Sequence, residues 1–166
     1  MKKTALLTII LIVSCKTGTS DLKRKNMNEI KREVTSKSFV ELPAATIWDK
    51  LVSFGGTEKF VPELIEKVNV QGEGIGAIRT IHLKGGGEIV EKLTKIDVKN
   101  YHMEFIILST PMPIQEYTGV FEVQKISSKK CEVLFISKYK VSRENENEMK
   151  NIIKGFQETF ISNLDK

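Results

Sequence analysis

From residue 64 to residue 141 apolar and polar side chains alternate almost without interruption, and no other feature of the chain constrains its fold as strongly. Successive side chains of a β-strand point to opposite faces of a sheet, so this period of two predicts strands with one buried face. Segments rich in glycine, proline, serine and asparagine break the alternation and predict turns. The predicted strands are residues 65–71, 77–83, 88–96, 101–108, 116–124 and 132–141.

The segments on either side of the alternating region predict one further strand and three helices. Residues 34–42 alternate weakly before Pro43, which is typical of an edge strand. Residues 43–54 carry an apolar stripe that two glycines end, and residues 57–62 form a second short helical turn. From Ser142, a good N-cap residue, the chain continues as a long helix. Its apolar stripe has helical spacing and consists of Met149, Ile152, Ile153, Phe156, Phe160 and Leu164.

The last helix decides how the sheet is covered. One face of an antiparallel sheet must be buried, and only this helix has an apolar stripe long enough to cover that face. The sequence therefore predicts an α+β protein in which a curved antiparallel seven-stranded sheet wraps around a long C-terminal helix, with two short helices between strands 1 and 2. A chain of 166 residues has room for one such domain, which we place at residues 34–166.

The N-terminus resembles a bacterial export signal. Two lysines precede an apolar run that is too short to span a bilayer, so residues 1–14 are predicted to be a signal peptide. Ile12, Ser14 and Cys15 resemble a lipobox, in which the cysteine is lipidated; the alternative is an ordinary secretory signal followed by a chance cysteine. With the lipobox in use, polar residues 15–33 form a tether. We then expect a domain anchored to a membrane of the bacterial cell envelope and facing the periplasm.

Charge and side-chain types exclude several classes of function. The formal net charge is +5, but the basic residues are scattered, and no basic stripe with interleaved aromatic residues suggests a nucleic-acid groove. His82 and His102 fall on the predicted solvent face and share no metal-ligand spacing, so neither a metal nor another cofactor is expected. After lipidation of Cys15 only Cys131 remains, so the chain is not expected to contain an internal disulfide.

The buried face of the predicted sheet is apolar but contains five polar residues. These are Arg79, Glu91, Tyr117, Ser137 and Tyr139, and Gly119 leaves a gap beside Tyr117. Each polar residue is open to the alternative of a satisfied core group or a wrong register, but together they are typical of a small-molecule pocket. The predicted lining residues are Arg79, Ile81, Leu83, Glu91, Leu93, Met103, Phe105, Ile107, Tyr117, Gly119, Phe121, Phe135, Ser137 and Tyr139 from the sheet, with Met149, Ile152, Ile153 and Phe156 from the last helix.

Glu91 requires a partner if it lies on the buried face. With the three glycines of residues 85–87 as the hairpin loop, Glu91 faces Ile81 and lies diagonal to Arg79, within reach of its long side chain. We therefore expect Glu91 to stay ionised, held by Arg79 directly or through water, with Tyr117 as a further donor. The alternative is an ion pair with a purely structural role.

Six segments of the folded part carry a family resemblance: ELPAATIWDKLVSF, FVPELIEKV, GEGIGAIRTI, GEIVEKLTKID, MPIQEYTGVFEV and the last helix, rich in phenylalanine and leucine. They resemble the START-like (SRPBCC) superfamily with its helix-grip fold, particularly the bacterial polyketide cyclase/dehydrase-like branch. The resemblance covers residues 34–166 and implies a domain that binds or processes a hydrophobic small molecule such as a lipid, sterol, polyketide or plant hormone. It also implies that a glutamate at the position of Glu91 contacts the polar end of the ligand.

The same resemblance suggests two gate loops. The first is residues 85–87 and the second is residues 109–114, and in the related plant hormone receptors the loops at these two places close over the ligand. The glycines make the first loop conformationally free, and the prolines stiffen the second. The alternative is that both are simple hairpin turns. The gate candidates are Gly85, Gly86, Gly87, Pro111, Met112 and Pro113.

Two functions of different classes follow from this reading. The first is a non-catalytic carrier or sensor that holds a hydrophobic ligand in a cavity between sheet and helix. The second is a cyclase or dehydratase acting on a polyketide-like substrate, with Glu91 or Tyr117 as acid or base. An enzyme of this kind needs at least two titratable groups placed across the substrate, and no histidine lies near Glu91, so the sequence favours binding.

Overall fold

The computed structural model describes residues 28–166, so the predicted signal peptide, Cys15 and most of the predicted tether lie outside the described residues. None of the helices in the described part combines the length and the apolar character that a bilayer crossing requires. The elements in chain order are β1 (Glu29–Val40), α2 (Ala44–Val52), α3 (Thr57–Phe60), β2 (Ile65–Gln71), β3 (Ile78–Leu83), β4 (Glu88–Asp97), β5 (His102–Ser109), β6 (Ile114–Lys125), β7 (Cys131–Ser142) and α4 (Glu146–Ser162).

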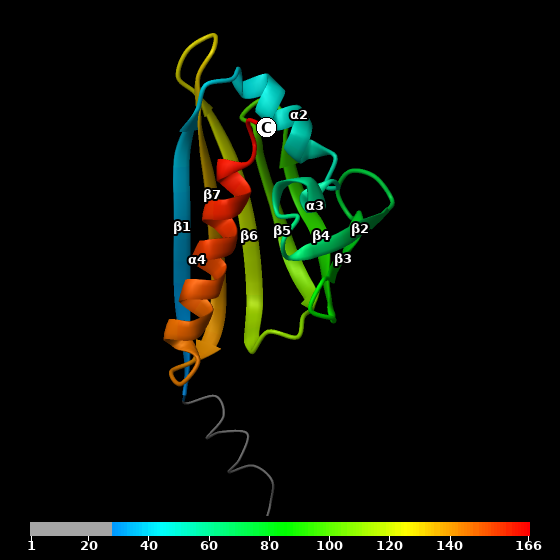
Figure 1. The fold of residues 1–166 in the computed structure, drawn as a ribbon, viewed down its shortest axis with the longest axis vertical. Helices are drawn as coiled ribbons and strands as arrows, with labels where there is room; N and C mark the ends of the chain where they lie inside the picture. The colour runs from blue at the N-terminus through cyan, green and yellow to red at the C-terminus, as the bar shows by residue number, and fades with distance from the viewer. Residues whose placement is uncertain (1–27) are drawn as a thin grey trace, which may run out of the picture.

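The seven strands form one sheet in the order β1-β7-β6-β5-β4-β3-β2, and every neighbouring pair is antiparallel. Figure 1 shows the sheet curving around α4, which crosses the concave face of the sheet over β1 and β7. The short helices α2 and α3 lie near the C-terminal end of α4. The predicted α+β helix-grip architecture, with two short helices between the first two strands, is confirmed.

Two element boundaries differ from the prediction by more than two residues. β1 begins at Glu29 and not at Val34, so the last residues of the predicted tether belong to the sheet, where they pair with the end of β7. This part of β1 is an edge strand, whose backbone pairing needs only weak side-chain alternation. α4 begins at Glu146, because β7 continues to Ser142 and three turn residues follow it.

Aromatic rings fill the interior beneath α4. The ring centroids of Phe121 and Phe135 are 4.1 Å apart, and Phe156 and Phe160 of α4 lie 6.2 and 5.8 Å from Phe135. This part of the interior is therefore closely packed by side chains. The predicted inner-face residues that are buried here and in the adjoining part of the sheet are Ile81, Leu93, Met103, Phe105, Phe121, Phe135, Met149 and Ile153.

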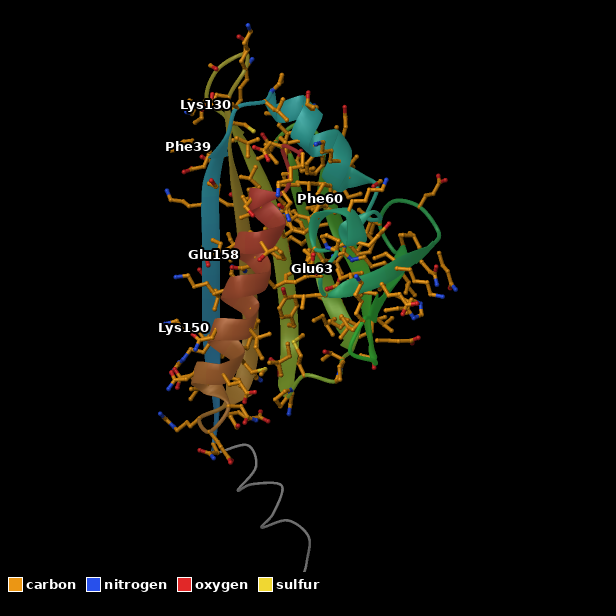
Figure 2. All side chains as sticks on the ribbon, in the orientation of Figure 1. Phe39, Phe60, Glu63, Lys130, Lys150 and Glu158 are labelled. Atoms are coloured by element: carbon orange, nitrogen blue, oxygen red, sulfur yellow. The ribbon has the colours of Figure 1, made fainter. Side chains whose placement is uncertain are left out.

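Ile152 is the exception among the residues predicted to face the interior, because it is 47% exposed. The buried stripe of α4 follows Ile153 and Gln157, and Ile152 lies about 100° around the helix from Ile153. Figure 2 shows Lys150 on the flank of α4 beside β1, and Ile152 lies roughly 200° from Lys150. Ile152 is therefore on the flank of α4 that faces away from β1.

Candidate functional site

Arg79 and Glu91 form a buried ion pair on the concave face of the sheet, and they lie directly opposite each other in β3 and β4. The predicted diagonal arrangement is wrong, since Ile81 faces Ile89 and not Glu91. The hairpin loop is still three residues long but lies one position earlier in the chain, at residues 84–86, because the Leu83 amide donates to the Gly87 carbonyl at 3.1 Å. The shift leaves odd-numbered residues on the inner face, so the predicted face assignment for this hairpin holds.

The contacts of Arg79 tie the sheet to the segment between α2 and α3. Its Nε donates to Oε2 of Glu91, and its Nη1 donates to the Phe54 carbonyl at 3.3 Å and to Thr57 Oγ1 at 3.2 Å. The guanidinium also lies 4.2 Å from the ring centroid of Phe54 and 4.8 Å from that of Phe105. The sequence did not indicate Phe54 or Thr57 as partners, because only the folded chain brings this segment onto β3.

Burial dominates the electrostatics of this pair. Arg79 is 6% exposed and Glu91 is 5% exposed. Removal from water raises the pKa of Glu91 above its ordinary value, and the charge and hydrogen bond of Arg79 act in the opposite direction. Arg79 is therefore the group that makes an ionised Glu91 tolerable at this position.

A second polar cluster joins the sheet to α4. The hydroxyls of Tyr117 and Ser137 are 2.7 Å apart, and Gln157 Nε2 donates to Ser137 Oγ at 2.8 Å and to the Val34 carbonyl at 3.1 Å. The predicted hydrogen bond from Tyr117 to Glu91 is replaced by this contact with Ser137. Burial is the main cause that raises the pKa of Tyr117 above its ordinary value, so its hydroxyl stays protonated.

Gln157 was not predicted from the sequence, because it is a polar residue within the apolar stripe of the helix. Its position at helical spacing between Ile153 and Phe160 was the available signal, since a glutamine there must be buried. It is 0% exposed, and its Oε1 has no hydrogen-bond partner within residues 28–166. An unpaired buried acceptor of this kind is costly unless something else satisfies it.

Gly119 does not leave the predicted gap beside Tyr117. It faces Phe105 in the β5–β6 pairing, and a Cβ atom built on Gly119 would lie 2.2 Å from Cζ of the Phe105 ring. The far end of the Phe105 ring therefore lies against the glycine and fills the space.

The sheet opens between the ends of β5 and β6. Pairing of these strands ends at Ile106 and Thr118, and beyond it β6 contains a register shift at Glu116, whose φ is 48°. The opening forms a hollow of about 320 Å³, which we call the β5–β6 hollow. It is lined by Ile107, Leu108, Ser109, Thr110, Ile114, Gln115, Glu116 and Tyr117.

Two of the predicted pocket residues line this hollow. Ile107 is half-buried and faces Glu91 across the β4–β5 pairing. Tyr117 lines the hollow and its hydroxyl contacts Ser137, which in turn contacts Gln157. Leu83 and Phe156 are also half-buried, whereas Tyr139 is buried and its hydroxyl has no partner in the described part of the chain. Neither Arg79 nor Glu91 lines any of the four surface hollows found in residues 28–166.

The two predicted gate loops lie close to each other. A Cβ atom built on Gly87 would lie 3.5 Å from Cγ of Pro111, so the β3–β4 and β5–β6 loops approach within contact distance. Gly85, Gly86, Gly87, Pro111 and Pro113 are exposed, and Met112 is half-buried against the core. Their role as a gate stays a prediction.

The histidines lie away from this site. His102 contacts Glu104 and Glu122, and His82 contacts Asn69 and Glu88, all on the outer face or edge of the sheet. Within residues 28–166 no group of three or more histidine, cysteine, aspartate or glutamate side chains is placed to hold a metal ion.

Comparison with known proteins adds a family and a set of similar folds. The family described as polyketide cyclase / dehydrase and lipid transport matches residues 31–166. The Zhui aromatase/cyclase from Streptomyces sp. R1128 has a TM-score of 0.72 at 15% identity, with 81% of this chain and 92% of that chain covered. Norcoclaurine synthase from Thalictrum flavum has a TM-score of 0.69 at 16% identity, with 96% of each chain covered.

An uncharacterized protein from Bacillus thuringiensis has a TM-score of 0.68 at 16% identity, with 81% of this chain and 96% of that chain covered. No curated protein matches the sequence. At these identities the solved structures show a shared fold and no shared activity. The family match spans nearly the whole described part, and the predicted resemblance is thereby confirmed. The chain belongs to the polyketide cyclase/dehydrase and lipid transport family, within the START-like (SRPBCC) superfamily of helix-grip proteins.

Proposed function

We propose that this domain is a non-catalytic binder of an uncharged hydrophobic small molecule of the lipid or polyketide type. The observation that carries the proposal is the β5–β6 hollow, which opens the curved sheet at Ile107 and Tyr117. Its volume of about 320 Å³ is at the lower end of the range for ligand pockets, roughly 300–1,000 Å³. The surface of the hollow itself is mainly polar, so the half-buried apolar residues at this end of the domain, Leu83, Ile107 and Met112, provide the apolar surface for a ligand.

The buried charges favour an uncharged ligand. Arg79 already contacts Glu91, the Phe54 carbonyl, Thr57 and two aromatic rings, which leaves it poorly placed to bind a ligand anion. Glu91 does not line the hollow, but it faces Ile107, which does. Because Arg79 uses Oε2 of Glu91, Oε1 is the carboxylate atom that we expect to accept a hydrogen bond from a ligand hydroxyl that reaches past Ile107.

The second polar cluster supports recognition of a hydroxyl group. Ser137 Oγ accepts from Gln157, and Tyr117 and Ser137 share one hydrogen bond, so one of their two hydroxyl hydrogens remains unused. Gln157 Oε1 is an unused acceptor close to them. Ser137 and Gln157 are fully buried and do not line the hollow, so the Tyr117 hydroxyl is the group of this cluster that a ligand hydroxyl can contact.

The same contacts argue against catalysis. A general base must be free to take a proton, whereas Glu91 is held by Arg79. The raised pKa of Tyr117 keeps its hydroxyl protonated, so Tyr117 could act only as an acid and would lack a free base as its partner. We therefore place the cyclase/dehydratase alternative second.

The proposal is tested by identifying what the protein binds. The full chain is incubated with a total lipid extract, washed, and extracted with organic solvent, and the bound molecules are identified by mass spectrometry. We expect an uncharged lipid that carries a hydroxyl group and is recovered chemically unchanged. Recovery of a dehydrated or cyclised product would instead support the enzyme.

A matched pair of variants locates the binding site. Ile107→Arg places a charge in the β5–β6 hollow and is expected to abolish ligand recovery, while Ile126→Arg, at a 53% exposed position in the β6–β7 turn, leaves it unchanged. Equal recovery from a folded Ile107→Arg variant and from wild type would contradict the proposed location.

We further propose that Cys15 carries a lipid anchor. Buried acyl chains contribute about 0.8 kcal/mol per CH₂ group, so a lipidated chain stays with the membrane. Cys15→Ser is expected to leave the chain soluble or retained with an uncleaved signal peptide, as judged by fractionation and intact mass. A Cys15→Ser variant that is processed and fractionates with membranes as tightly as wild type would rule out the anchor.

A further inference from the structure

The outer strand β1 is an unusually long free edge. It has twelve residues and pairs with β7 without any register shift. Within residues 28–166 no strand pairs with its other side, because β1 is the first strand in the sheet order (Figure 1). β2, at the opposite edge, has seven residues and a register shift, which makes it a poor template for pairing.

A long and regular edge can pair with another strand unless its side chains prevent it. The outward-facing side chains of β1 contain both signs of charge, and their order determines which strand they fit. These residues are Glu29, Lys31, Glu33, Thr35, Lys37 and Phe39.

We propose that two copies of this chain pair through β1, antiparallel, about a two-fold axis that passes through Thr35. In this register Glu33 faces Lys37 of the second copy, and by symmetry Lys37 faces Glu33 of the second copy. On the concave face Ile30 likewise faces Val40 of the second copy. The pairing joins the two sheets into one continuous antiparallel sheet.

The charges disfavour the neighbouring registers. A two-fold axis between two residues would set concave-face residues against convex-face residues, so only residue-centred axes keep the faces together. An axis at Val34 sets Lys31 against Lys37, and axes at Glu33 or Arg32 set each of these residues against its own copy. Like charges directly opposite each other destabilise a sheet, so these three registers are disfavoured. An axis at Ser36 brings no like charges together but sets Glu33 against Phe39, so it lacks the two Glu33–Lys37 pairs.

The charged neighbours on β7 extend the pattern. Lys138 Nζ lies 3.9 Å from Glu33 Oε2, and Lys37 Nζ lies 3.1 Å from Glu132 Oε1. Lys138 faces Glu33 in the β1–β7 pairing, whereas Glu132 lies diagonal to Lys37. With the axis at Thr35, the sign of the charge therefore alternates from Lys138 to Glu33 and on to Lys37 and Glu132 of the second copy, which is the charge complementarity expected of an interface.

Disulfide trapping tests the pairing. Thr35→Cys, in the full chain carrying Cys15→Ser, places two thiols opposite each other at the axis, within the Cα separation of about 4.4–6.8 Å that a disulfide needs. Cys131 is buried and does not interfere. Mild oxidation is expected to give a dimer on a non-reducing gel, whereas Thr46→Cys in the same background, exposed on α2, stays monomeric.

Charge reversal tests the register. In the Thr35→Cys background, Glu33→Lys alone or Lys37→Glu alone is expected to reduce the dimer at least tenfold, and the two together are expected to restore it. Thermal melting of each variant checks the fold. The proposal is overturned if Thr35→Cys gives no more dimer than Thr46→Cys, or if the double reversal does not recover the dimer that the single reversals lose.

Discussion

Replacing Arg79 with methionine is expected to lower the free energy of unfolding by about 3–5 kcal/mol at neutral pH, because it leaves Glu91 buried without its partner. Methionine keeps much of the apolar packing against Phe54 and Phe105, so the loss reports mainly the stranded carboxyl group. Chemical denaturation monitored by Trp48 fluorescence measures it. Arg32→Met is the control, since the Arg32–Glu146 pair is partly exposed to solvent and its loss should change the stability much less.

The pH dependence identifies the cause of this loss. Without Arg79 nothing opposes the effect of burial, and the pKa of Glu91 rises further above its ordinary value. A carboxyl group whose pKa is higher in the folded than in the unfolded chain contributes its stability fully below the unfolded pKa of about 4.3. That contribution is lost as the pH rises through the pKa of the folded state. The deficit of Arg79→Met is therefore expected to be smallest at about pH 4 and to grow toward neutral pH.

A second substitution should relieve the deficit. Arg79→Met combined with Glu91→Leu removes both charges and is expected to recover most of the lost stability at neutral pH. A deficit that is the same at acidic and neutral pH, or that Glu91→Leu does not relieve, would mean that lost packing and not the stranded carboxyl group destabilises the variant.

Gly119→Ala is expected to destabilise the domain by about 3 kcal/mol, at the upper end of the usual cost of overpacking. The added Cβ would lie 2.2 Å from Cζ of Phe105, a distance at which the ring must move. That ring also contacts Arg79, Phe54 and Phe121, so it has no free direction in which to move.

Gly155→Ala is the matched control for this substitution. Gly155 lies in α4, and a Cβ atom built on it would have no heavy atom within 4 Å. Alanine there should stabilise the helix by up to about 1 kcal/mol. Urea denaturation of both variants gives the comparison. A Gly119→Ala variant as stable as wild type would show that the Phe105 ring is not confined against the sheet.

The sequence was sufficient for the architecture because alternation reports directly which face of a strand is buried. The strand over residues 65–71 was predicted with its observed boundaries, and the inward parity of Arg79 and Glu91 survived an error in the hairpin. That error arose because alternation does not show which three residues form the loop: Lys84, Gly85 and Gly86 form it, and Gly87 already pairs with Leu83. Gly87 has a φ of 91°, which is typical of a loop residue, yet its carbonyl accepts the backbone hydrogen bond from Leu83 and so belongs to the paired part of the hairpin.

The site was harder to predict, because its key features depend on contacts between distant segments. The β5–β6 hollow arises from an irregularity at Glu116, a non-glycine residue with positive φ that no local turn motif marks. Gln157 becomes a partner of Ser137 only when α4 crosses the sheet. The gap predicted at Gly119 was filled by a residue on the neighbouring strand, which alternation alone does not place opposite it.

Hydrogen exchange of the full chain with and without N-phenyl-1-naphthylamine, an uncharged apolar probe that fluoresces when bound, tests most directly whether a hydrophobic ligand occupies the β5–β6 hollow. We expect backbone amides in residues 107–117 and 84–87 to exchange more slowly when the probe is bound, while those in the β6–β7 turn at residues 126–130 are unchanged. Bound probe, shown by its fluorescence, with unchanged exchange in residues 107–117 and 84–87 would contradict ligand binding at this site.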